Sequence, residues 1–237
     1  MTNNRLTPQF TPDCTKGETI FGLFWLLMHM FVCPLLLNTV QETLLPDLTP
    51  VAGNALYYGI SLAVTLLFGM KLLRREFDHL LDRLFHCVKG FFATYLFWYA
   101  MSLAMVAVLS LLNLTQELPN DMAMDELATE NYRVTLTLSV IVAPILEEIL
   151  FRGILFQSVR KRSRLWAYVI SIAMFSLYHV WQFAYYYADW HYLLFALQYI
   201  PITLALTWGY EHTGSLWVPI FFHASNNYLA MQVMQMM

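Results

Sequence analysis

Long apolar stretches dominate this sequence and limit what it can fold into. A bilayer core about 30 Å thick is crossed by about 20 helical residues. Stretches of that length lie near residues 19–40, 52–73, 90–114, 133–157, 165–186, 190–210 and 215–235. Only 12% of the residues are charged, whereas in soluble domains about a quarter are. The sequence therefore predicts an all-α fold, a polytopic transmembrane helical bundle with these spans.

Basic residues are distributed unevenly between the predicted spans. Lysines and arginines collect in residues 74–89 and 158–164, whereas residues 41–51 and 185–191 contain none. Loops rich in Lys and Arg usually stay on the cytoplasmic side of a membrane. We therefore expect the amino terminus, both basic loops and the 211–214 turn to be cytoplasmic.

The sequence predicts one membrane domain with two parts. Residues 1–132 contain amino-terminal transmembrane helices, and residues 133–237 contain a second group of helices packed against them. Within the first part, residues 74–88 have apolar side chains at helical spacing. This pattern predicts an amphipathic helix on the cytoplasmic membrane surface or, equally, a connector packed on the bundle. Short loops and the lack of a recognisable targeting signal favour a bacterial cell membrane.

Charge and cysteine patterns argue against other classes of protein. The sequence has no basic stripe of the kind that binds nucleic acid, so we expect no nucleic-acid partner. Its three cysteines, Cys14, Cys33 and Cys87, are scattered along the chain. Their spacing indicates neither a disulfide framework nor a CxxC metal site.

Three formal charges interrupt the fourth apolar stretch, in the sequence APILEEILFRG (residues 143–153). A charge within a membrane span costs roughly 2.5–3.5 kcal/mol and usually faces a bundle interior or a wet cavity. Glu148 and Arg152 are four residues apart and share a helix face, whereas Glu147 is rotated by about 100°. We therefore expect Arg152 to neutralise one glutamate while the other faces a different environment.

The fifth and seventh stretches carry imidazoles at a comparable depth. His179 follows Phe175 by four residues, and Asn227 follows His223 by four. Counted from the cytoplasmic borders at the helical rise, His179, Asn227 and Glu147 lie roughly 18–21 Å into the membrane. His223 lies roughly 12 Å in. These side chains occupy one slab of the membrane, where they can meet.

Together these residue types suit the attack of water on a peptide carbonyl. Glu147 or Glu148, shielded from bulk water, can accept a proton from a water molecule that His179 orients. His223 and Asn227, one helical turn apart, can donate hydrogen bonds to the oxyanion that forms. No serine or cysteine stands in an evident nucleophilic dyad. Each residue taken alone also has a structural interpretation, as an interhelical hydrogen bond or a buried ion pair.

The sequences EEILFRG, FSLYH and HASNN resemble the EExxxR, FxxxH and HxxxN motifs of the CPBP family. These intramembrane peptidases, also called the Abi family, are related to the type II CAAX prenyl endopeptidase. The resemblance covers about residues 133–237 and implies eight spans, one more than the hydropathy pattern gives. The catalytic residues that it implies are Glu147, Glu148, Arg152, His179, His223 and Asn227. The resemblance implies that Glu147 activates water together with His179. Glu148 and Arg152 support them, and His223 and Asn227 bind the oxyanion.

The sequence thus predicts an intramembrane endopeptidase that uses no cofactor. We expect its substrate to be a membrane-associated or prenylated protein or peptide that it meets within membrane lipid. A zinc-dependent protease is an alternative, because two histidines and a carboxylate can bind Zn²⁺, but the sequence has no HExxH. A non-catalytic peptide-binding immunity protein and a proton-coupled transporter are further alternatives. His29, alone in the first span, is interpreted as structural.

Overall fold

The structure is a computed structural model that describes residues 10–111 and 119–236. Within these ranges the regular elements are helices, so the predicted all-α polytopic bundle is confirmed. The α-helices are α1 (Lys16–Leu27), α2 (Cys33–Thr43), α3 (Pro50–Asp82), α4 (Leu84–Leu111), α5 (Pro119–Thr137), α6 (Ala143–Glu148), α7 (Gln157–Arg160), α8 (Arg164–Tyr178), α9 (Trp181–Tyr186), α10 (Ile200–Thr213) and α11 (Trp217–Met236). Three π-helical segments, η1 (Met28–Val32), η2 (Leu138–Val142) and η3 (Ile149–Phe156), and a 3₁₀ segment, η4 (Trp190–Tyr199), connect them.

Among the described residues, helical runs long and apolar enough to cross a membrane correspond to five of the seven predicted spans. They are Lys16–Thr43, Pro50–Asp82, Leu84–Leu111, Pro119–Arg160 and Trp190–Thr213. The predicted span 165–186 is divided, because Val180 leaves helical geometry between α8 and α9. The last predicted span forms α11, whose hydropathy is lowered by its histidine, asparagines and glutamines. Both departures occur in the predicted spans that contain His179 and His223.

The predicted amphipathic helix over residues 74–88 is not a separate element. Helix α3 continues to Asp82, Arg83 leaves helical geometry with φ −133° and ψ 31°, and α4 starts at Leu84. The apolar residues of this segment are therefore divided between the end of one long helix and the start of the next.

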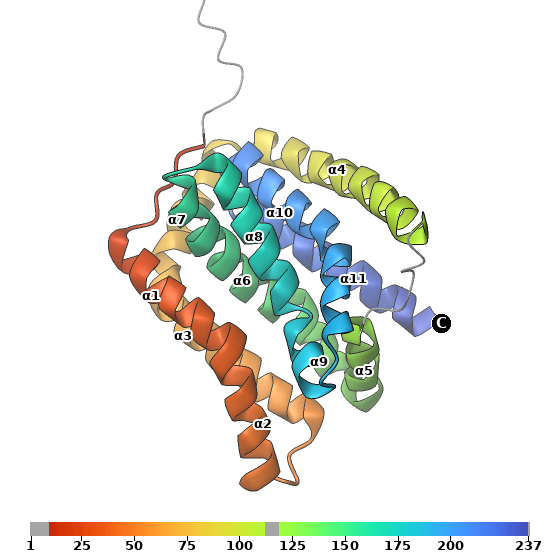
Figure 1. Ribbon diagram of the computed structural model, residues 1–237. Coiled ribbons are helices and arrows are strands. Elements are labelled where there is room, and N and C mark those ends of the chain that lie inside the picture. Colours follow the sequence, from red (N-terminus) through yellow and green to blue (C-terminus); the bar gives the residue numbers. More distant parts are fainter. Residues whose placement is uncertain (1–9, 112–118, 237) are drawn as a thin grey trace, which may run out of the picture.

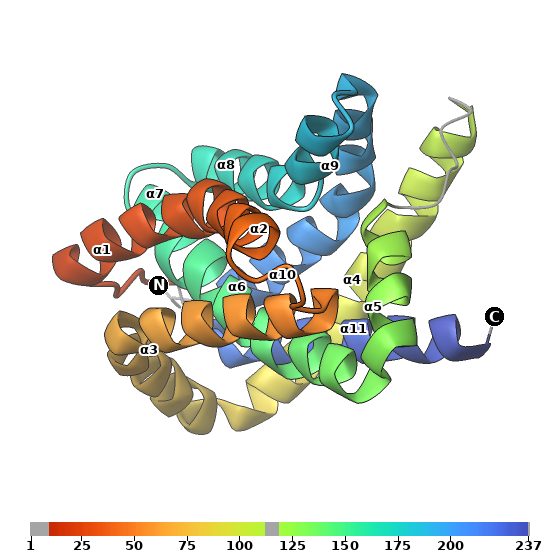
Figure 2. The ribbon, with the colours of Figure 1, turned by 90° about the horizontal axis from the view of Figure 1, so that it is seen from below.

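The centre of the bundle is the continuous run of α6 and η3. Helices α3 and α11 contact α6, while α1, α8 and α10 contact η3, and Figures 1 and 2 show α6 enclosed in both views. The fully buried apolar side chains of this run are Leu146, Ile149, Leu150, Phe151, Ile154 and Phe156. A helix that is apolar on every side belongs in the middle of a bundle. Since amino-terminal helices supply part of this shell, both halves of the chain pack together.

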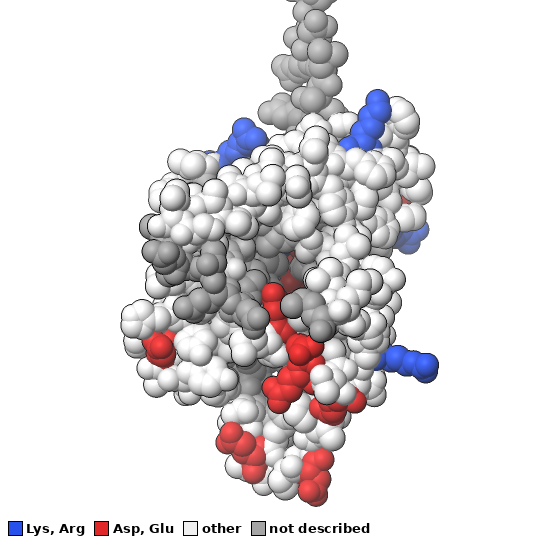
Figure 3. Space-filling model, turned by 90° about the vertical axis from the view of Figure 1, so that its right-hand side faces the viewer, with Lys and Arg blue, Asp and Glu red and all other residues white. Residues whose placement is uncertain are grey.

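On one face of the molecule, basic and acidic side chains are distributed unevenly along its long axis. Figure 3 shows Lys and Arg mainly in the upper half of one face and Asp and Glu in the lower half, beside a hollow. The upper end contains the α3–α4 junction, α7 and the α10–α11 turn, and the lower end contains α2 and α9 (Figure 1).

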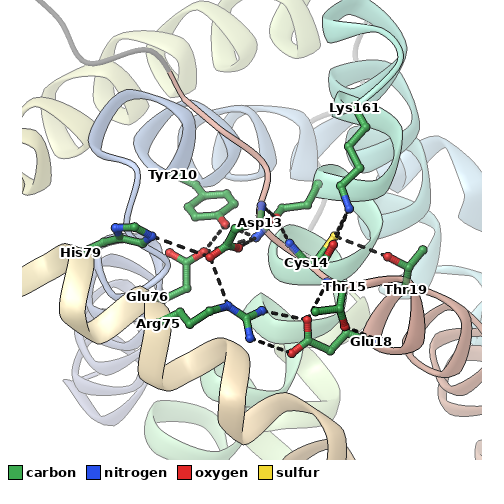
Figure 4. A network of polar contacts seen from close by, with 11 residues as sticks. Asp13, Cys14, Thr15, Glu18, Thr19, Arg75, Glu76, His79, Lys161 and Tyr210 are labelled. Atoms are coloured by element: carbon green, nitrogen blue, oxygen red, sulfur yellow. Dashed lines mark hydrogen bonds and ion pairs between the residues drawn. The ribbon is translucent and has the colours of Figure 1, made fainter.

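A polar network fastens the start of α1 to the rest of the bundle (Figure 4). Thr15 and Glu18 form a capping box at the helix start. Arg75 of α3 donates to Glu18 through Nη1 at 3.0 Å and Nη2 at 2.8 Å, and to Asp13 through Nε at 3.2 Å. Gln157 of α7 accepts from the backbone N–H of Asp13 at 2.8 Å. The chain before the first span is therefore tied to two other helices.

Candidate active site

Glu148 and Arg152 form a fully buried ion pair one helical turn apart. Arg152 Nη1 donates to Glu148 Oε1 at 2.9 Å, and both side chains have 0% exposure. The guanidinium lies 4.3 Å from the ring centre of Phe175, a cation–π contact. Its Nη2 donates to the carbonyl of Thr203 at 3.4 Å. The buried charge of Glu148 is thus compensated, and the predicted contact between these residues is present.

His223 of α11 joins this pair from the opposite side. Its Nδ1 lies 2.9 Å from Glu148 Oε1. Because an ionised carboxylate only accepts hydrogen bonds, this nitrogen carries a proton. The other ring nitrogen, Nε2, lies 3.9 Å from Glu147 Oε2. His223 therefore connects the buried ion pair with the second glutamate.

Glu147 has different surroundings from its neighbour in the chain. Its side chain lines a cavity of about 710 Å³, although only 3% of the residue is exposed. Among the residues that the structure describes, Oε2 has no hydrogen-bond partner. A buried polar atom without a partner calls for a ligand or an ordered water. The distance of 3.9 Å to His223 is long enough for water to take part in this contact.

His179 lies at the end of α8 and lines the same cavity. Its Nδ1 bonds the carbonyl of Phe175 at 2.9 Å. Since a carbonyl can only accept, Nδ1 is the donor, and in the neutral ring Nε2 remains free to accept. The ring packs between Phe175, at 4.6 Å between centroids, and Tyr199, at 4.5 Å. Within residues 10–111 and 119–236, no ion pair joins His179 directly to Glu147.

Asn227 also lines the cavity, one turn beyond His223 on α11. Its Nδ2 donates to the carbonyl of Ser139 in η2 at 2.9 Å. One N–H of the amide is therefore committed to the backbone, and the other remains available. The four predicted residues that share the cavity wall are Glu147, His179, His223 and Asn227. Glu148 and Arg152 lie behind the wall and reach it through His223.

Several tyrosines on the cavity wall were not predicted as site residues. Tyr57 and Tyr178 line the cavity, and both hydroxyls contact the buried ring of His29, at 3.0 Å and 3.1 Å. His29 also contacts Ser61 Oγ at 3.2 Å. Tyr57 lies near the end of a predicted span, where tyrosines are typical of the interfacial belt. Tyr178 lies within the second motif, next to His179, but at a position that the motif leaves open, so neither residue was identified from the sequence.

The arrangement of possible metal ligands is sparse. In the described part of the chain, no group of three His, Cys, Asp or Glu side chains is placed to hold a metal ion. The three cysteines are free and lie on different elements.

The six predicted site residues all lie in one segment with a recognisable relationship. Residues 129–229 match the model of a family described as Type II CAAX prenyl endopeptidase Rce1-like. The predicted resemblance to CAAX-type proteases is confirmed over this segment, which is less than half of the chain. The apolar helices are those of an integral membrane protein. No curated protein and no solved structure matched the chain.

Proposed function

We propose that this protein is an intramembrane endopeptidase in which Glu147 activates a water molecule to attack a peptide carbonyl. The observation that carries the proposal is that Glu147 lines a 710 Å³ cavity and that its buried Oε2 has no hydrogen-bond partner among the residues that the structure describes. His223 Nε2 lies 3.9 Å from Glu147 Oε2, and His179 lines the same cavity, so the cavity wall carries groups able to orient water and a group able to accept its proton.

In this mechanism water is held between Glu147 and His179. Glu147 takes one proton, His179 Nε2 accepts a hydrogen bond from the other hydrogen, and the oxygen forms a bond to the carbonyl carbon. The π electrons of the carbonyl move to its oxygen. The tetrahedral intermediate then expels the amine as the C–N bond breaks, and Glu147 returns its proton to the leaving nitrogen. The products are a carboxylic acid and an amine.

Asn227 and His223 are the proposed donors to the oxyanion. Asn227 supplies the N–H that Ser139 does not use. His223 donates through Nε2 when its ring is protonated at both nitrogens, and Glu148 on Nδ1 stabilises that charged ring. Glu148 and Arg152 are positioning residues in this proposal, because they act through His223. Removing an oxyanion donor typically lowers a rate by 10²–10³.

We propose that this chemistry needs no metal. Glu148 Oε1 is shared between Arg152 Nη1 and His223 Nδ1, each at 2.9 Å. This oxygen is therefore occupied by two donors and is not free to bind a cation, while Glu148 Oε2 has no hydrogen-bond partner among the described residues. Zn²⁺ bound by His179, His223 and Glu147 stays the alternative, and treatment with a chelator can test it.

The proposed substrate is a membrane-associated peptide, with or without a prenyl group. Apolar and aromatic side chains make up more than half of the cavity lining, and polar side chains of α2, α3, α5 and α11 share the wall with Glu147. Such a lining suits a chain segment that enters from lipid and is fixed by a few hydrogen bonds. The separation of charges in Figure 3 supports a cytoplasmic amino terminus, since the basic end of the molecule belongs inside. A bacterial cell membrane stays a prediction.

The test is mass spectrometry of membrane peptides from cells that express the wild type or Glu147→Gln. This change keeps the size of the side chain but removes its ability to accept a proton. We expect cut products that appear with the wild type and disappear with the variant. Glu126→Gln, at an exposed glutamate of α5, is the control and should leave the products unchanged. Identical products with wild type and Glu147→Gln would rule out the mechanism.

A further inference from the structure

Tyr199 is a cavity residue whose hydroxyl forms no hydrogen bond with the described residues. It ends the 3₁₀ segment η4 and is 8% exposed. Its ring stacks on His179, with centroids 4.5 Å apart and planes inclined by 29°. Both residues line the cavity that contains Glu147. The phenol therefore lies directly beside the histidine to which the mechanism assigns the attacking water.

The hydroxyl of Tyr199 is buried and has no hydrogen-bond partner within the described ranges. Buried tyrosines usually find a partner, because an unpaired hydroxyl loses its bonds to water without replacement. Other tyrosines on this wall follow that rule, since Tyr57 and Tyr178 both bond His29. The carboxyl groups of Asp121 and Glu147 are near enough to interact electrostatically with the phenol. Neither of them accepts its hydrogen bond.

We propose that the Tyr199 hydroxyl donates a hydrogen bond to a backbone carbonyl of the bound peptide, next to the bond that is cut. This inference rests on the proposed function and adds a substrate-contacting residue to it. A neutral phenol is a donor, and a peptide in an extended conformation presents carbonyl oxygens that need donors once water is excluded. The ring has a second effect. By stacking on His179 it limits rotation of the imidazole about its Cβ–Cγ bond, so that Nδ1 keeps its hydrogen bond to the Phe175 carbonyl.

Two substitutions separate the hydroxyl from the ring. Tyr199→Phe removes one oxygen and keeps the stacked ring, whereas Tyr199→Leu removes the stack as well. Tyr192→Phe is the matched control, because Tyr192 belongs to the same segment and stacks on Tyr187 but is not among the residues that line the cavity. Each variant is compared with the wild type by its melting temperature in detergent, so that a folding defect is recognised.

The assay uses purified full-length protein and a synthetic peptide that spans the cut mapped by mass spectrometry. A hydrogen bond to the ground-state peptide contributes equally to substrate and transition state, so its loss raises KM and leaves kcat nearly unchanged. We expect Tyr199→Phe to raise KM about ten-fold. Tyr199→Leu should also lower kcat about ten-fold or more, because His179 is no longer held. Tyr192→Phe should behave like the wild type.

Glu147→Gln is measured in the same assay to keep two failures apart. If Glu147→Gln is inactive and Tyr199→Phe has wild-type KM and kcat, the inference about Tyr199 is wrong and the proposed function stands. If Glu147→Gln still cuts the peptide, the proposed function is wrong. If cells that express the wild type contain no cut products beyond those in cells that express Glu147→Gln, both proposals are wrong.

Discussion

Glu147 and Glu148 are adjacent in the chain and have opposite environments. One residue along a helix is a rotation of about 100°, which turns Glu148 towards Arg152 and Glu147 towards the cavity. The two carboxylates therefore differ in their partners. Glu148 Oε1 accepts from two donors, whereas Glu147 Oε2 has no hydrogen-bond partner within the described residues, and the proposed function assigns proton transfer to Glu147.

The ion pair behind the cavity makes a prediction about stability. Arg152→Met leaves the fully buried Glu148 without its main counter-charge. Removing one partner of a buried pair typically costs about 3–5 kcal/mol, more than the pair contributes when intact. We expect Arg152→Met to lower the free energy of unfolding by this amount, measured by denaturant unfolding in detergent micelles and followed by circular dichroism.

A double variant separates charge burial from packing. Glu148→Gln combined with Arg152→Met removes both charges, so most of the lost stability should return. The double variant should stay inactive, because His223 Nδ1 no longer bonds a carboxylate. Equal instability of the single and double variants would contradict this account and would indicate that loss of the Arg152–Phe175 contact dominates.

At the scale of elements, the sequence predicted helix existence better than helix ends. The run from Ala143 to Phe156 is apolar on all sides apart from its charges, and it forms the buried centre of the bundle. Hydropathy alone could not divide the span 165–186, because the residues around the break at Val180 are mostly apolar. It also could not show that α3 continues to Asp82. Long polar side chains at a helix end look alike whether the helix lies on a membrane or extends from it.

The attachment of α1 to α3 makes a prediction at this scale. Arg75→Ala removes three hydrogen bonds from Asp13 and Glu18, and Glu18 is 8% exposed. Leaving a buried carboxylate without these donors costs about 1–3 kcal/mol. We expect faster amide hydrogen exchange in residues 16–27 and a lower free energy of unfolding. Arg74→Ala, at the exposed neighbour, is the control.

The Arg75 experiment has a clear contrary outcome. If hydrogen exchange in α1 is the same in Arg75→Ala and Arg74→Ala, the capping box and the apolar contacts hold the helix without the network of Figure 4.

At the scale of the whole molecule, the cavity belongs to both halves of the chain. Its lining includes Tyr57 and Tyr58 of α3 and Trp98 of α4, together with residues of the Rce1-like segment. The three motifs named six candidate residues by type and spacing, and the structure places four of them on the cavity wall. Their roles stay a prediction. The amino-terminal wall was not predictable. Its tyrosines line the cavity only because folding places them beside residues that are distant in the sequence.

The arrangement of possible metal ligands in the described residues leads to the last prediction, that activity does not depend on a metal. One carboxylate oxygen of Glu148 is already shared by two donors, and no three candidate ligands converge within residues 10–111 and 119–236. Purified protein treated with 1,10-phenanthroline should therefore keep its activity on the mapped peptide. Elemental analysis should find well below one metal ion per chain. A known zinc peptidase in the same detergent is the positive control. If the chelator abolishes activity and added Zn²⁺ restores it, the zinc alternative is established, because restoration by the metal shows that the activity requires it.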